Sequence, residues 1–456
     1  MKRIIDSLIV VFLVYINIYA QEEKIIVTGN SLVGKKEQGK NIRIIAGNVA
    51  IKHNNSIIIC DTAYQFVEDN SVALYGNVKF KRNNLIITTQ QAFYDGNKKK
   101  LETKNQIEAN DGNFYIRSDN GEYDAEDEIA RLSGRIFFRD SNKTIICDKA
   151  IYKRKEEKIV CEGNARLNYD EFIAFADRVE YFKKRNFVKA ESNARIKNTR
   201  EKTILASNLS EIFLDEKKAF AYCSPVIYKI DTASINQIDT LIISADKFQY
   251  VYKDKEKKIF AGRNVLFYSS QLISRSDTLI FDLIDSTIST HKISSKPTAW
   301  FNSSQIKADS IFIKILNRQP LFASLHRNVL FVEEIDSILF KYNQLSSDSA
   351  KVFFSNSKIS LINSYQKVLS VYYLFDDGEA NGVLKSSSDY AVAVFEDSKI
   401  VNVKLYNNPV SEYYPESLVE NKTIDFLLPG FELDKNKFTK QAIIRLNTTL
   451  KKEMRE

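Results

Sequence analysis

The chain has 456 residues, of which 66 are Lys or Arg and 58 are Asp or Glu, so its formal net charge is +8. This mild excess is not the concentrated basic face that nucleic-acid binding requires, and we expect no nucleic-acid partner. Four cysteines are too few for a disulfide scaffold, and 14 glycines are too few for a glycine-rich calcium-binding roll.

Residues 1–20 have the order of a secretory signal peptide. Lys2 and Arg3 precede an apolar run over residues 8–15, and Ala20 is a typical small residue at a cleavage site. The run is short for a membrane span, although a retained anchor is the competing interpretation. No cysteine follows the cleavage site, which argues against a lipoprotein. We expect the mature chain in the periplasm, either free or associated with the outer membrane.

From residue 59 onward a short pattern returns every 29 residues. Each copy has a β-favouring run, a small residue and then an acidic or polar marker. The first five markers are Asp61, Gln90, Asp119, Asp148 and Asp177. Later markers are Ser207, Asp246, Asp277, Asp309, Asp348 and Asp389, at wider intervals that indicate insertions. Such a period is typical of an array whose units bury their apolar faces against their neighbours.

A second marker falls between successive acidic markers, and one copy precedes the first. Its copies are Gly47-Asn48, Gly76-Asn77, Gly134-Arg135, Gly163-Asn164, Asn264-Val265 and Asn328-Val329. Glycine and asparagine tolerate backbone angles that other residues resist, so these positions predict turns or bulges where strands start.

Between the markers, apolar and polar residues alternate with a period of two, which predicts strands. The phase changes at each acidic marker. Ile58 and Cys60 share one face, but the next inward candidates, Ala63 and Gln65, have the opposite parity. Only a bulge or corner at the Asp would return both halves to one interior. We therefore interpret the Asp as a structural corner residue, with a row of metal ligands as the alternative.

An aromatic residue often follows four places after the acidic marker. These residues are Tyr94, Tyr123, Tyr152, Tyr181, Tyr250 and Phe281, and stacked units would align them as ladders. The three histidines lie near no cysteine or serine motif of a nucleophile, and no phosphate-binding loop is present. We therefore expect neither an enzyme nor a cofactor.

These features together resemble the OstA/LptA superfamily of lipopolysaccharide-transport proteins, and most of all the OstA-like proteins of Bacteroidetes. The resemblance covers roughly residues 24 to 435. Motifs near the C-terminus keep the family's order: residues 377–383, 388–390, 414–415 and 428–431. The family's following Trp and Arg-Pro are absent, and residues 432–437 stand in their place.

The resemblance implies an all-β fold, a repetitive β-jellyroll or taco-shaped roll of about 29-residue units. Its apolar interior would receive the acyl chains of lipid A, whose transfer from water is worth ~25 cal/mol per Å². The family's function implies a non-catalytic periplasmic carrier that takes lipopolysaccharide toward the outer membrane within an envelope-assembly bridge. Its partners would be other lipopolysaccharide-transport proteins, joined by end-to-end strand pairing, or head-to-tail copies of itself.

We expect a continuous apolar face to line this groove. Its predicted members are Val49, Ile51, Ile58, Val78, Phe80, Tyr94, Ile116, Tyr123, Ile136, Phe138, Ile145, Tyr152, Tyr181, Tyr250, Val265, Phe267 and Phe281. For any one of them, ordinary hydrophobic core is the alternative interpretation.

The expected organisation is a signal peptide (1–20), a first part of the roll (21–230), a second part (231–415) and a C-terminal extension (416–456). The extension would hold a short helix or a loose tail from residue 436, and a single continuous roll is the alternative for the rest. Two other functions stay open: a β-solenoid scaffold of the envelope, and a glycan-binding or polysaccharide-active protein with clustered carboxylates.

Overall fold

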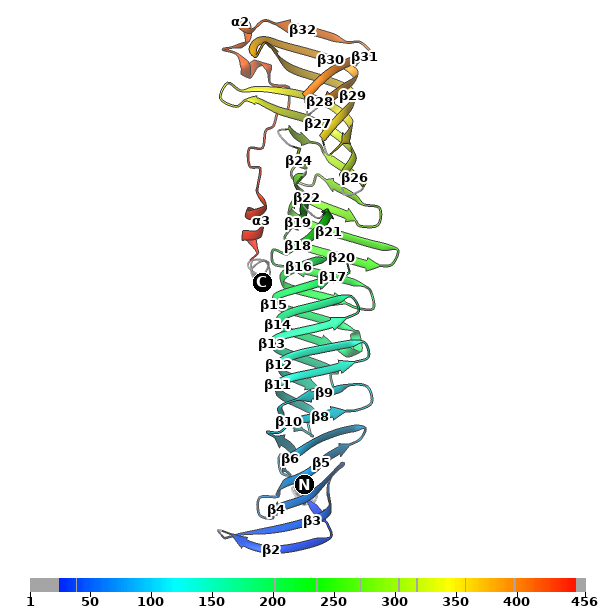
Figure 1. Ribbon diagram of the computed structural model, residues 1–456, viewed down its shortest axis with the longest axis vertical. Helices are drawn as coiled ribbons and strands as arrows, with labels where there is room; N and C mark the ends of the chain where they lie inside the picture. The colour runs from blue at the N-terminus through cyan, green and yellow to red at the C-terminus, as the bar shows by residue number, and fades with distance from the viewer. Residues whose placement is uncertain are drawn as a thin grey trace, which may run out of the picture. The chain divides into compact units, whose positions relative to one another are not determined.

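The computed structural model describes residues 24–37, 39–200, 202–234, 237–270, 272–301, 304–316, 319–356, 358–396 and 399–447. Most of them lie in antiparallel β-strands, which confirms the all-β fold (Figure 1). The expected signal peptide lies outside the described residues. Among those described, none of the helices is long and apolar enough to cross a lipid bilayer.

The chain divides into two compact units, one ending at Asp170 and one beginning at Glu171. The boundary expected at residues 230 and 231 falls inside the second unit. There β18 and β19 form one hairpin, in which Ile230 pairs with Thr240 and Thr232 with Ile238. The division into two rolls at that point stays a prediction.

The first unit contains thirteen strands in its described residues. They are β1 (Ile26–Thr28), β2 (Ser31–Glu37), β3 (Lys40–His53), β4 (Ser56–Phe66), β5 (Ser71–Arg82), β6 (Leu85–Asp95), β7 (Lys100–Thr103), β8 (Ile107–Asn110), β9 (Tyr115–Ser118), β10 (Asn120–Asp124), β11 (Ile129–Asp140), β12 (Lys143–Lys153) and β13 (Lys158–Tyr169).

The second unit continues with strands and three short helical segments before its last helix. They are β14 (Phe172–Phe182), η1 (Lys183–Arg185), β15 (Phe187–Asn198), β16 (Thr203–Phe213), β17 (Lys218–Tyr222), β18 (Val226–Ser234), β19 (Gln237–Ser244), β20 (Lys247–Lys253), β21 (Glu256–Tyr268), β22 (Ile273–Asp282), β23 (Thr287–His291), β24 (Thr298–Phe301), β25 (Ser304–Lys307), β26 (Ser310–Leu316), β27 (Gln319–Asp336), β28 (Lys341–Ser355), β29 (Lys358–Asp376), β30 (Glu379–Glu396), β31 (Lys399–Tyr406), β32 (Val410–Tyr414), α2 (Glu416–Val419), η2 (Thr423–Phe426) and α3 (Lys440–Leu446).

A bulge in the middle of the long strands turns both halves toward one interior, as the sequence predicts. The pairing of β4 with β5 shifts register between Ile59 and Thr62. On either side of the shift, Ile58, Cys60, Ala63 and Gln65 are all buried despite their opposite parity. The bulge therefore exchanges the inward and outward faces at the marker.

The bulges also fold each strand so that its two halves belong to facing walls. Phe80 pairs with Ile87 on β6, and Tyr94 lies seven residues further along that strand. A straight strand would separate residues 87 and 94 by about 23 Å. The Phe80 and Tyr94 ring centroids are only 6.3 Å apart, so the strand halves face each other. We call the row of bulges the spine, and the opposite side, bordered by two rows of turns, the mouth.

The marker Asp joins neighbouring strands at the spine. In the first unit Asn77 donates to Asp61 (2.9 Å), Arg135 pairs with Asp119 (2.9 Å) and Asn164 donates to Asp148 (2.8 Å). Each donor has a positive φ of 39° to 48°. We call each of these contacts a spine staple. The second unit repeats it in Asn193–Asp177, Asn264–Asp246, Asn328–Asp309 and Asn408–Asp389.

The spine staple gives the marker Asp a structural role, as we interpreted it. Among the described residues, no group of three or more His, Cys, Asp or Glu side chains lies close enough together to hold a metal ion.

Residues 415–447 form a segment that we call the C-terminal strap, which runs along one side of the second unit (Figure 1). Ile443 of α3 is fully buried against Ala206, Val226 and Ile242. These residues lie on the face opposite the interior, because the alternate positions Leu205, Ile227 and Phe267 form the inward row of cross-strand pairs. The strap therefore covers the outside of a wall.

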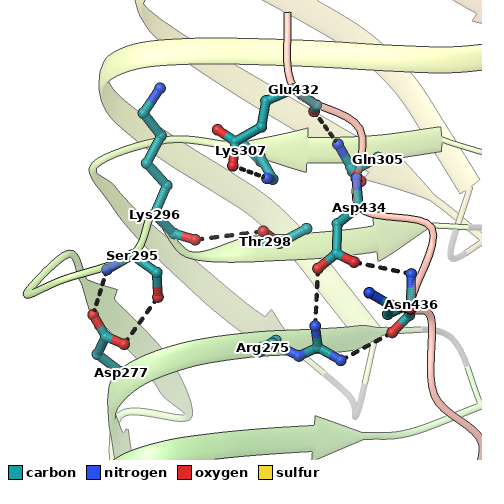
Figure 2. A network of polar contacts seen from close by, with 10 residues as sticks. All are labelled: Arg275, Asp277, Ser295, Lys296, Thr298, Gln305, Lys307, Glu432, Asp434 and Asn436. Carbon is teal, nitrogen blue, oxygen red and sulfur yellow. Dashed lines mark hydrogen bonds and ion pairs between the residues drawn. The ribbon is translucent and has the colours of Figure 1, made fainter.

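Several polar contacts of the strap come from residues 432–436, where the chain departs from the OstA/LptA pattern (Figure 2). Arg275 pairs with Asp434 (3.0 Å) and donates to the carbonyl oxygen of Asn436 (2.9 Å). Lys307 pairs with Glu432 at 2.6 Å. Helix α3 follows within the region expected to hold a helix or a loose tail.

Replacing a spine glycine tests the staple. Gly163 has a φ of +74°, and an added Cβ would lie 2.8 Å from Asp148 Oδ2. We expect Gly163→Ala to lower the free energy of unfolding by about 1 to 3 kcal/mol in chemical denaturation. Gly34→Ala is the control, because nothing lies within 4 Å of its Cβ position. Equal effects of the two substitutions would contradict the role of the spine.

Candidate functional site

The interior of the first unit is a filled core. It holds twelve of the residues predicted to line a groove, Val49 through Tyr152, and each is at most 6% exposed. A cavity of about 20 Å³ remains beneath Arg154, bordered by Leu85, Ile107, Phe114 and Tyr152. That is room for about one water molecule. Burial here agrees with the predicted inward face, whereas a role in lipid binding stays a prediction.

The aromatic residues of this core interleave instead of stacking tyrosine on tyrosine. Phe80 contacts both Tyr94 and Tyr123, with ring centroids 6.3 and 5.7 Å apart. The ring centroids of Phe114 and Tyr152 are 4.6 Å apart. The expected tyrosine ladder therefore has phenylalanines between its rungs, because bending of the strands brings the opposite wall between successive units.

Four polar residues bridge the mouth of the first unit, and we call them the Arg154 clasp. Asn84 and Asp111 lie in turns of one row, and Glu128 and Arg154 lie in turns of the other. Arg154 Nη1 lies 3.0 Å from Glu128 Oε2, and Nε lies 3.8 Å from Asp111 Oδ2. Nη2 donates to Asn84 Oδ1. These contacts close the side of the roll above the filled core.

The second unit buries four of its five predicted interior residues. Tyr181, Val265, Phe267 and Phe281 are buried. Tyr250 is half-buried, but it lies on the inward face because its cross-strand partners Ala219 and Ile259 are buried there.

The last strands of the second unit border a cavity of about 190 Å³ that opens to solvent at β31, where the lining residue Val403 is half exposed. Its apolar lining includes Phe331, Leu345, Ile362, Leu384 and Val403. None of the seventeen predicted groove residues lines it. The cavity is therefore a part of the interior with room for a ligand.

Small side chains explain why this part of the interior is hollow. Ser364, Ser386, Ala391 and Ala393 line the cavity. Ala393 lies four places after the marker Asp389, where the first unit has the buried rings of Tyr94, Tyr123 and Tyr152. The Ser364 hydroxyl is buried without a hydrogen-bond partner among the described residues. Sequence reasoning missed the cavity because intervals of 39 and 41 residues obscure the repeat here, although the alternation of Ala391, Ala393 and Phe395 marks an inward face.

One polar contact lies at the edge of the cavity. Asn343 donates to Glu333 at 3.1 Å, and both residues contribute to the lining. Among the described lining residues, Glu333 alone carries a carboxylate. The arrangement offers an apolar interior with a few hydrogen-bonding groups, which suits the tail of an amphiphile.

Residues 22–133 match a family described as OstA-like protein. No curated protein matches the chain. Over these residues the match agrees with the resemblance to the OstA/LptA superfamily.

Removal of the arginine tests the Arg154 clasp. We expect Arg154→Ala to lower the free energy of unfolding by about 2 kcal/mol, because Asp111 and Glu128 would keep their partly buried charges without a partner. It should also increase the binding of a fluorescent apolar dye by opening the mouth. Arg131→Ala is the control, since Arg131 pairs with Glu122 on the surface and should cost at most about 1 kcal/mol. A dye signal equal to that of the control would contradict the clasp.

The buried tyrosines predict a loss of stability at alkaline pH. Burial raises the pKa of Tyr94 and of Tyr123 to about 12 each. The folded-state pKa lies above the unfolded value of about 10, so this stabilisation is present below pH 10 and is lost as the pH rises to 12. Tyr94→Phe should flatten the fall of the unfolding free energy over this range, and a Tyr94→Phe, Tyr123→Phe double variant should flatten it further. Unchanged slopes in denaturant titrations would refute this.

Proposed function

We propose, on the premise that the chain belongs to the OstA/LptA superfamily, that it is a non-catalytic periplasmic protein carrying lipopolysaccharide toward the outer membrane. It would act within an envelope-assembly bridge, with acyl chains of lipid A in the apolar interior. The observation that carries this proposal is the cavity between the walls of β27 to β31.

The cavity favours an acyl chain over a polar ligand. Ligand pockets with a mostly apolar lining and a few polar groups accept apolar molecules and fix their orientation. Each methylene group that leaves water for such a place gains about 0.8 kcal/mol. The serine hydroxyls and the Glu333–Asn343 pair would contact the polar part of the amphiphile.

The lining also favours a carrier over a glycan hydrolase. Such hydrolases use a pair of carboxyl groups on either side of the scissile bond. The described lining offers Glu333 alone. We therefore propose that the interior binds its ligand without altering it.

Terminal strands support the proposed end-to-end partners. In the first unit β2 pairs with β3 on one side, and its Leu32 and Val33 are 60% and 59% exposed. In the second unit β31 pairs with β30 on one side, with Val401 and Val403 half exposed. Among the described residues no strand pairs with the other side of either. Open edges of this kind accept a further strand, from another transport protein or from a second copy.

Site-specific photo-crosslinking in cells tests the proposed ligand. A photoreactive residue at Leu384, which lines the cavity, should capture lipopolysaccharide. The same residue at the neighbouring outward Lys385 should not. A second pair, Phe80 inside the first unit and Lys79 outside it, asks whether lipid also enters the filled core. Equal labelling at Leu384 and Lys385, or none at Leu384, would refute the carrier.

A further inference from the structure

The repeat of the first unit is broken at one spine position. The spine glycines lie at 47, 76, 134 and 163, so a period of 29 places another at 105, where the chain has Asn105. The marker that would face it is Gln90 instead of Asp. The position after it, which elsewhere supplies the staple's donor, is Gln106. Departures from a repeating pattern are places where function competes with the fold.

The backbone is interrupted at the same level. Strand β7 ends at Thr103 and β8 begins at Ile107, whereas β5 and β11 run through their bulges. The Thr103 hydroxyl donates to the carbonyl oxygen of Gln91 at 2.6 Å and accepts from the backbone N–H of Asn105 at 3.0 Å. The loop of residues 104–106 is thereby held in a defined position.

A hollow of about 620 Å³ opens on the outer face of the first unit at this break. Tyr75 and Phe93 line it, with 41% and 40% of their surfaces exposed. Lys104, Asn105 and Lys149 contribute polar groups. Its volume falls within the range of small-ligand sites, roughly 300 to 1,000 Å³.

Two lysines that line the hollow are available to contact an anionic ligand. Arg131 pairs with Glu122 at 2.7 Å, and both line the hollow. Glu102 is a second carboxylate of the lining, which therefore carries three cationic and two anionic side chains. Among the described residues, neither Lys104 nor Lys149 makes an ion pair, and both are placed to meet an anionic group on a ligand.

We propose that this hollow binds an anionic oligosaccharide of two or three rings that carries phosphate or carboxylate groups. A sugar ring has an apolar C–H face, which suits an exposed aromatic ring, and hydroxyl groups, which suit amide and charged side chains. The two lysines match the acidic substituents. The hollow opens outward at Tyr75 and Phe93, and its floor reaches the buried Leu74 and Leu132. It can be tested separately from the proposed lipid carriage, because its ligand needs no acyl chain.

Titration calorimetry of the purified full chain tests the site with probes that lack acyl chains. The probes are the phosphorylated oligosaccharide of fully deacylated lipopolysaccharide, a uronic-acid oligosaccharide of similar length, and a neutral gluco-oligosaccharide. At least one anionic probe should bind more tightly than the neutral one, and its identity shows whether the source is lipopolysaccharide or an acidic polysaccharide. The absence of binding by both anionic probes would overturn the proposal without affecting the lipid carrier.

Variants of the lining distinguish this site from general surface attraction. A Tyr75→Ala, Phe93→Ala double variant should weaken the anionic probe at least about tenfold. Lys104→Glu should weaken it and reduce its salt dependence. The controls are Phe137→Ala and Lys79→Glu, at outward positions of the same unit away from the hollow. Equal effects of lining and control variants would overturn the proposal.

A repaired repeat gives a second, independent test. Gln90→Asp, Asn105→Gly and Gln106→Asn together restore the residues of a spine staple at the break. This triple variant should keep or raise the unfolding free energy while it loses the anionic probe. A folded triple variant that binds as the unchanged chain does would overturn the assignment of the hollow.

Discussion

The contact between a marker Asp and a left-handed residue on the neighbouring strand is the constraint on which the rest of the structure depends. It holds the bulge at which each strand exchanges its inward and outward faces, as in Asn164–Asp148. Without that exchange, half of every alternating strand would turn its apolar residues to water. The contact recurs at seven of the eleven markers. Within each compact unit the bends therefore align into a spine, and the strand halves become two facing walls.

The same framework yields a filled core in the first unit and a cavity in the second unit. Interleaved rings such as Phe80 and Tyr123 fill the first unit, and the Arg154 clasp closes its mouth. In the last strands of the second unit, serine and alanine at inward positions leave the apolar cavity. Side-chain volume, and not backbone topology, therefore decides where the interior can receive a ligand.

Two features of the structure do not follow the repeat: the C-terminal strap and the interrupted spine at Asn105. The strap buries Ile443 on the outside of one wall, and residues 432–436, where the resemblance to the OstA/LptA pattern ends, add ion pairs to that wall. The interrupted spine at Asn105 opens the outer hollow of the first unit. In both places the chain departs from its own regularity or from the OstA/LptA pattern, and in both the departure creates polar contacts that the array alone would not supply.

The sequence by itself determined the strands, the bulges and the inward face, because period and parity are local properties: sixteen of the seventeen predicted interior residues are buried. Only the tertiary structure decided the clasp, the cavity and the strap. Asn84 and Arg154 are 70 residues apart, and Arg275 and Asp434 are 159 apart, with no shared pattern to predict their meeting. The volume of a cavity depends on the side chains of both walls together, so the sequence of one strand does not determine it.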